Sequence, residues 1–136
     1  MIKPADILHR NHVVRTGCRE GILSAIQQAG EPLSEREIRD RLEDRFDRTT
    51  FYRSFKLLQE KHILHKIVVD DSVKYGVDEL LSRRGDHAHF YCTRCSTVRC
   101  LEQVRVEKQK LPEGYSIEET QLVIKGLCEE CNAGKR

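Results

Sequence analysis

Four cysteines occur as two pairs with the same short spacing in the C-terminal part of the chain. Cys92 and Cys95 form the first pair and Cys128 and Cys131 the second, with 32 residues between the pairs. Four thiolates suit a tetrahedral Zn²⁺ ion, and a shell filled by four sulfurs leaves no open position for catalysis. The spacing therefore predicts a structural zinc site that joins the end of the chain to the first cysteine pair.

Other chemistry fits these cysteines less well. The first pair lacks the βαβ pattern that surrounds a thioredoxin-like redox motif. A zinc deaminase would have a glutamate in place of His89 and a proline in place of Tyr91. The chain has no apolar run near the roughly 18 residues of a membrane span, and residues 1–10 lack the features of a signal peptide. We therefore expect a cytoplasmic protein with reduced thiols and no membrane partner.

Two histidines and a further cysteine lie close to the first pair. In an extended strand His87 and His89 share one face and the first cysteine pair begins on the other, so the histidines need a different partner. Cys100 on the next predicted strand and an acid near the hinge, Glu79 or Asp78, are within reach. Together they would form a second site with nitrogen, sulfur and oxygen ligands. The alternative, surface histidines beside a core Cys100, stays open.

A small sheet must position these ligands. The expected order is a strand over 88–92, a strand over 97–101, a short helix from about Glu102, and a strand over 116–125. Zinc would clamp the last strand to the first. The polar, glycine-containing stretch 81–86 is the candidate hinge, and it divides the chain into residues 1–82 and 83–136.

Residues 1–82 have the pattern of three helices, each beginning with a good N-cap residue. The caps are Thr16, Ser34 and Asp47. Ser34 and Glu37 form a capping box, and Gly30 suits the end of the first helix because glycine adopts a positive φ at little cost. The third helix carries apolar residues at helical spacing: Phe51, Phe55 and Leu58.

Two β-like runs, ILHKIVV and SVKYGV, follow the third helix. Asp70-Asp71 joins them as a hairpin turn. Three helices followed by a hairpin is the order of a winged helix-turn-helix. We therefore predict an α+β fold, in which a winged helix-turn-helix precedes a small α/β domain stapled by the four-cysteine zinc site.

The face of the third helix opposite its phenylalanines predicts a DNA-binding surface. It carries Thr49, Tyr52, Arg53 and Lys56, with Arg48 at its start. Cationic groups suit phosphates, whereas hydroxyls and a ring suit base edges. The net charge of +2 argues neither for nor against binding of nucleic acid, so the prediction depends on where the basic residues lie on this helix. An ordinary solvated face is the alternative, which the capping box, the short turn and the hairpin disfavour.

Taken together, these residues resemble the ferric uptake regulator (Fur) family of metal-dependent bacterial repressors. The stretch RTGCREGIL is similar to the family's first DNA-domain helix, with Thr16 and Arg19 in place. The stretch TTFYRSFKLLQEKHILHKI resembles its recognition helix and wing, and Thr50, Tyr52 and Arg53 match the usual Thr-x-Tyr-Arg. The stretches HAHFYCTRC and GLCEEC match the histidine-rich first knuckle and the closing knuckle.

The resemblance implies a repressor without catalytic activity that binds a palindromic operator in double-stranded DNA as a homodimer. Dimerisation would belong to residues 83–136. The DNA contacts would be Arg19, Thr50, Tyr52, Arg53 and Lys56. Each subunit would hold the structural zinc and a regulatory divalent metal near the hinge, Zn²⁺ or Fe²⁺. The ligands of the regulatory ion would be His87, His89, Cys100 and Glu79.

The regulatory ion would set the angle between the DNA-binding domains, which requires that it binds one arrangement more tightly than the other. A zinc-stapled protein-interaction module that does not bind DNA is the alternative function.

Several positions depart from the family pattern. Pro32 and Gly76 stand where many members have a histidine and an acidic ligand, so Glu79 is only an approximate replacement. Ser96 replaces a glycine that commonly follows the first knuckle. Cys100 replaces a carboxylate that is common in iron-sensing members. A thiolate favours Zn²⁺ over Fe²⁺ or Mn²⁺, and its oxidation would release the ion.

The remaining cysteine and histidines have no predicted role. Cys18 is expected to pack within a helix. The other histidines are expected at the surface or in the wing: His9, His12, His62 and His65.

Overall fold

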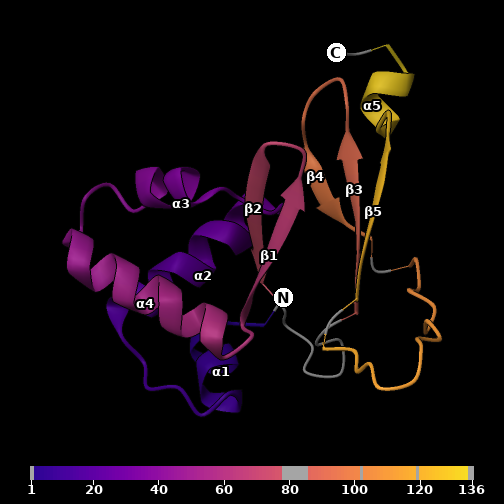
Figure 1. Cartoon of the computed structure of the whole chain (residues 1–136). Helices are drawn as coiled ribbons and strands as arrows, with labels where there is room; N and C mark the ends of the chain where they lie inside the picture. Colours follow the sequence, from indigo (N-terminus) through magenta and orange to yellow (C-terminus); the bar gives the residue numbers. More distant parts are fainter. Residues whose placement is uncertain (1, 78–85, 102, 119, 135–136) are drawn as a thin grey trace. The chain divides into compact units, whose positions relative to one another are not determined.

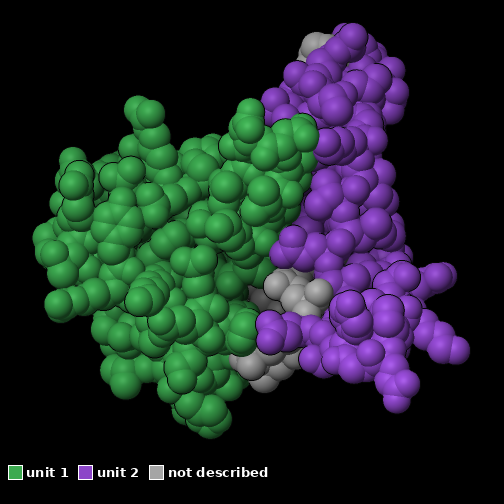
Figure 2. Space-filling model, viewed as in Figure 1, with its two compact units in different colours: residues 1–79 green, residues 80–136 purple. Residues whose placement is uncertain are grey.

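The computed structural model describes residues 2–77, 86–101, 103–118 and 120–134 (Figure 1). The chain forms two compact units, Met1–Glu79 (unit 1) and Leu80–Arg136 (unit 2), which Figure 2 colours separately. The predicted hinge falls almost entirely on residues outside the described ranges. Within those ranges, no helix combines the length and the apolar character needed to cross a membrane.

Within residues 2–77, unit 1 consists of helices followed by a hairpin (Figure 1). The elements are α1 (Pro4–Arg10), α2 (Gly17–Ala29), α3 (Glu35–Arg41), α4 (Arg48–Glu60), β1 (Leu64–Val69) and β2 (Ser72–Val77). Helix α2 packs against α1, α3, α4 and β2 and is therefore the centre of the unit. Helix α1 is additional to the three predicted helices; it spans only seven residues and its N-cap Lys3 makes no side-chain cap.

The N-caps predicted for the other three helices are confirmed. Thr16, Ser34 and Asp47 each accept a hydrogen bond from the backbone N–H three residues later. Ser34 and Glu37 form the complete capping box. Gly30 ends α2 with a φ of +70°, a conformation that glycine adopts without a clash of its side chain. These local interactions fix where each helix begins and, for α2, where it ends.

The core of unit 1 is formed by the inner faces of the helices and the hairpin. Its fully buried side chains include Ile7, Leu8, Ile22, Leu23, Leu33, Ile38, Leu58 and Ile63. Phe51 and Phe55 are also buried, with their rings stacked 5.6 Å apart. Burial of this face of α4 leaves its opposite face in solvent.

Strands β1 and β2 form the predicted antiparallel hairpin, the wing. Val69 pairs with Ser72, so Asp70-Asp71 is the two-residue loop, and Asp70 has a φ of +52°. The wing is also attached to the segment before α3, because Leu33 and Tyr75 exchange two backbone hydrogen bonds of 3.0 and 2.7 Å. Unit 1 is thus a winged helix-turn-helix.

Unit 2 is built on a three-stranded sheet. Its elements are β3 (Asp86–Cys92), β4 (Val98–Cys100), β5 (Thr120–Gly126) and the short helix α5 (Glu129–Asn132). Strand β3 lies in the middle, antiparallel to β4 and parallel to β5. The fold class is therefore α+β, as the sequence predicts.

The short helix predicted from about Glu102 is wrong for the part of this segment that the structure describes, residues 103–118. These residues form turns and irregular backbone. Val104 and Val106 are weak helix formers, and Pro112 and Gly114 interrupt a helix. Strand β5 also begins later than predicted, because its pairing with β3 starts at Asp86 opposite Thr120.

Candidate metal centre and nucleic-acid interface

The two cysteine pairs meet in unit 2. The Sγ atoms of Cys92 and Cys131 lie 3.5 Å apart, and those of Cys95 and Cys128 lie 3.8 Å apart. One donor atom from each residue lies within 4.8 Å of the others. A tetrahedral zinc ion with Zn–S bonds of about 2.3 Å would hold its sulfurs about 3.8 Å apart. The cluster therefore has the donor set and the size that suit a structural zinc ion.

The register of the sheet brings the pairs together. Cys92 is the last residue of β3 and lies opposite Gly126, the last residue of β5. The second pair follows β5 after one further residue, and Cys128 is the N-cap of α5. In the first pair the turn closes with a hydrogen bond of 2.9 Å from the Ser96 N–H to the Cys92 carbonyl.

The electrostatics of the cluster also suit a cation. The backbone N–H groups of Cys95 and Cys128 lie 3.5 and 3.4 Å from the Cys92 sulfur, and hydrogen bonding of this kind lowers the pKa of Cys92 to about 5. Burial and the neighbouring thiols raise the pKa of Cys131 to about 12. All four cysteines can therefore be ionised together only when a positive charge lies among them, and a divalent ion provides that charge.

The residues predicted for the second metal site lie on the same sheet or outside the described ranges. His89 pairs with Cys100 across β3 and β4, and the backbone of His87 pairs with Gln121 of β5. His89 is only 1% exposed, whereas Cys100 is exposed. Glu79 and Asp78 lie outside the described residues.

The cysteine cluster and His89 use opposite faces of β3. Phe90 packs against the cysteine cluster, and Cys92 shares its face because side chains alternate along a strand. His89 therefore projects to the other face, beside Cys100 on the neighbouring strand.

His65 lies in the wing, one of the two places expected for it, and its side chain is buried. It pairs with Gly76 across the hairpin, and a Cβ atom built on Gly76 would lie 2.8 Å from the imidazole ring. Glycine at this position leaves room for the ring. With a two-residue loop at Asp70-Asp71, the register places His65 opposite Gly76. This pairing is the sequence signal for a closely packed histidine, and it can be used only once the register is known.

The residues predicted for the DNA-binding face of α4 are all exposed. They are Arg48, Thr49, Thr50, Tyr52, Arg53 and Lys56. The hydroxyl of Thr50 donates to the carboxylate of Asp47, so it takes part in capping α4. The ammonium group of Lys56 lies 4.0 Å from Glu60 on the next turn, a weak, solvent-exposed ion pair.

Arg19 lies in the first turn of α2 and is half-buried. Its Nη1 donates to the carbonyl of Val14 at 2.6 Å. This contact holds the guanidinium group against the chain that leads into α2.

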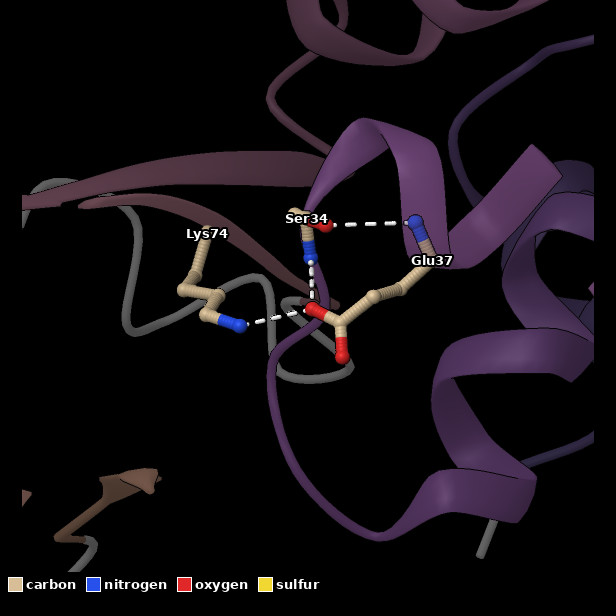
Figure 3. Close-up of polar contacts among 3 residues, drawn as sticks. All are labelled: Ser34, Glu37 and Lys74. Atoms are coloured by element: carbon tan, nitrogen blue, oxygen red, sulfur yellow. Dashed lines mark hydrogen bonds and ion pairs between the residues drawn. The ribbon is translucent and has the colours of Figure 1, made fainter. Parts of the chain in front are cut away.

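Two acids in the first turn of α3 hold the wing and α4. Figure 3 shows that one oxygen of Glu37 accepts from the Ser34 N–H at 2.9 Å and from the ammonium group of Lys74 on β2 at 2.6 Å. Partial burial opposes ionisation of Glu37, but the hydrogen bonds from Lys74 and Ser34 outweigh it and hold the pKa of Glu37 below its usual value. Glu35 accepts a hydrogen bond from the Tyr52 hydroxyl at 3.2 Å.

Comparison with known proteins places this arrangement in a family. The model of the ferric uptake regulator family matches residues 11–125. The ferric uptake regulation protein of Synechococcus elongatus is 30% identical over 123 residues, covering 83% of this chain and 82% of the relative.

Solved structures have the same fold. A zinc uptake regulator complexed with zinc and DNA has a TM-score of 0.69 at 20% identity, covering 96% of this chain and 91% of the other. The Helicobacter pylori ferric uptake regulator, whose structure is described as revealing three functional metal-binding sites, has a TM-score of 0.61 at 16% identity, covering 97% of both chains. The chain belongs to the ferric uptake regulator family.

Proposed function

We propose that the protein is a metal-responsive transcriptional repressor that binds a palindromic operator in double-stranded DNA as a homodimer and catalyses no reaction. The observation that carries the proposal is the exposed face of α4, where an arginine, a lysine, a tyrosine and two threonines stand beside a wing. Similarity to a zinc uptake regulator complexed with zinc and DNA supports it.

The side chains of α4 divide the work of DNA binding. Arg53 and Lys56 supply charge for phosphates or for guanine, and Tyr52 supplies a ring and a hydroxyl for base edges. Arg19 and Thr50 contact DNA in this proposal with groups that already have a protein partner. Their main contribution is therefore to hold the N-terminal ends of α2 and α4 in position.

The four cysteines would hold zinc as a structural ion. Cys92, Cys95, Cys128 and Cys131 supply four thiolates, and the ion supplies the charge that allows them to be ionised together. Because Cys92 ends β3 and Cys128 and Cys131 belong to the segment that follows β5, zinc bound here would join the end of β3 to α5.

A second ion would regulate DNA binding from a site formed by His87, His89, Cys100 and Glu79, with Asp78 as an alternative to Glu79. The register of β3 and β4 supports His89 and Cys100 as ligands of one ion, because directly opposed residues on antiparallel strands have Cβ atoms about 4.5–5.5 Å apart. The imidazole and thiolate favour Zn²⁺ over Fe²⁺. The ion would act at the hinge by stabilising one arrangement of the DNA-binding units.

The surface of unit 2 supports a homodimer. Within the described sheet β5 pairs on one side only, with β3. Leu122 and Ile124 on β5, and Leu127 after it, are about 40% exposed (38%, 38% and 41%). An apolar edge strand is a ready template for pairing with a second chain.

Operator titration of the Arg53→Ala variant tests the proposed function. The probe is a duplex selected by the wild-type protein from a randomised library. We expect an affinity at least tenfold lower and a shallower dependence on salt, because a cation at the DNA face is lost. Lys61→Ala, which removes a cation at the C-cap of α4, is the matched control and should have a smaller effect.

Unchanged affinity of Arg53→Ala would remove the recognition-helix assignment. Failure of the wild type to select any sequence would instead favour the alternative function, a zinc-stapled protein-interaction module.

A further inference from the structure

Tyr52 on the proposed DNA-reading face is already engaged by an acid of the same unit. Its hydroxyl lies 3.2 Å from Oε2 of Glu35, the first residue of α3. An ionised carboxylate only accepts hydrogen bonds, whereas a phenol has one proton to donate and two lone pairs that accept. The direction of this bond is therefore fixed: Tyr52 donates and Glu35 accepts.

Both partners lie next to residues that are fixed in unit 1. The Tyr52 ring meets the buried ring of Phe51 edge-on, with centroids 5.4 Å apart and an interplanar angle of 82°. Glu35 follows Ser34, the cap of α3, and the neighbouring Leu33 is tied to Tyr75 of the wing by two backbone hydrogen bonds. The Tyr52–Glu35 hydrogen bond is therefore formed in the protein without DNA.

A hydroxyl whose proton is committed can only accept from a ligand. In the major groove the groups that donate are the N6 amine of adenine and the N4 amine of cytosine, whereas guanine and thymine offer acceptors. Phosphate oxygens also accept only, and the Glu35 carboxylate repels them. The geometry thus directs Tyr52 away from phosphates and from guanine and thymine.

We propose that Glu35 is a specificity-determining residue of the protein: by accepting the Tyr52 proton, it makes Tyr52 a reader of an exocyclic amine of adenine or cytosine. The inference rests on the proposed DNA-binding function. Glu35 acts through Tyr52 and is a positioning residue.

The variant Glu35→Ala tests this directly, because alanine has no acceptor for the Tyr52 proton and leaves the hydroxyl free to donate to a base. Full-length, zinc-loaded wild type and variants are used to select duplexes from a randomised library. The wild type should prefer adenine or cytosine at one position of each half-site by about 2- to 10-fold, the range of one hydrogen bond. In Glu35→Ala this preference should weaken or shift towards guanine or thymine at that position alone.

Two further variants separate this effect from charge and shape. Tyr52→Phe should lose the preference at the same position. Glu37→Gln removes the same charge from the same turn of α3 but leaves the Tyr52 contact, so it should keep the wild-type preference.

The outcomes distinguish the inference from the function on which it rests. If Glu35→Ala selects the same bases as the wild type at every position, the proposed role of Glu35 is overturned, whatever Tyr52→Phe selects. A wild type that selects no sequence overturns the proposed DNA-binding function itself.

Discussion

The sulfur atoms of Cys92 and Cys131 lie 3.5 Å apart although the two residues are 39 positions apart in the sequence. The parallel pairing of β3 and β5 brings this about, because both strands end at the same level of the sheet. Unit 2 has few large buried side chains besides the cysteine cluster in its described residues. Zinc in such a cluster would therefore contribute much of the stability of the unit.

The first prediction concerns the proposed second metal site. Cys100→Ser should keep the tightly bound zinc and lose most of the affinity for a second ion, because serine removes the thiolate opposite His89. Metal titration followed by mass spectrometry under native conditions measures both ions. Cys18→Ser, at a buried position in α2, is the control and should bind both. Equal binding of two ions by Cys100→Ser would show that Cys100 is not a ligand.

The second prediction concerns the turn after the first cysteine pair. Ser96 has a φ of +62°, a left-handed conformation that disfavours residues with a side chain by roughly 1 kcal/mol. Ser96→Gly should raise the unfolding free energy of the zinc-loaded protein by up to about 1 kcal/mol. Ser116→Gly, at an exposed position without a positive φ, should give no gain. Chemical denaturation measures the difference, and a destabilised Ser96→Gly protein would contradict the prediction.

The third prediction is a pH dependence at the contact between α3 and the wing. The pKa of Glu37 lies below its usual value of 4.5, so its ion pair with Lys74 stabilises the fold above that pH and is lost as the pH falls through the folded-state pKa. A double-mutant cycle of Glu37→Gln and Lys74→Gln should give a coupling of about 0.2–1 kcal/mol at pH 7. The coupling should vanish in acid; a coupling that grows below pH 4 would contradict this sign.

The fourth prediction concerns the wing. Gly76→Ala places a methyl group 2.8 Å from the His65 ring and should lower the unfolding free energy by about 1–3 kcal/mol, as overpacking does. The double variant with His65→Ala should recover part of that loss, because the clash is then absent. Additive losses in the double variant would mean that Gly76 and His65 do not restrict each other.

Local signals made much of unit 1 predictable from the sequence. Thr16, Ser34 and Asp47 cap helices through contacts within one turn, and the spacing of Phe51, Phe55 and Leu58 identifies the inner face of α4. The hairpin was equally clear, because two aspartates separate two β-like runs. Each of these features depends on residues close in the sequence.

Features that depend on distant contacts were not predictable in the same way. The close approach of the His65 ring to Gly76 depends on the register of the hairpin, and the contacts of Glu35 with Tyr52 and of Glu37 with Lys74 depend on tertiary packing. The helix predicted after β4 is absent from residues 103–118, because the valines, the proline and the glycine of this segment disfavour a helix. The spacing of the four cysteines predicts that they share one metal ion. The distances between their sulfur atoms depend on the pairing of β3 with β5, which the spacing does not give.

The most direct test of the central claim, that four cysteines hold one structural zinc, is the zinc content of the purified protein after dialysis has removed weakly bound metal. The wild type and Cys18→Ser should retain one zinc ion per chain, whereas Cys131→Ser should lose it together with the thermal stability of unit 2. Full retention of zinc and of stability by Cys131→Ser would contradict the claim.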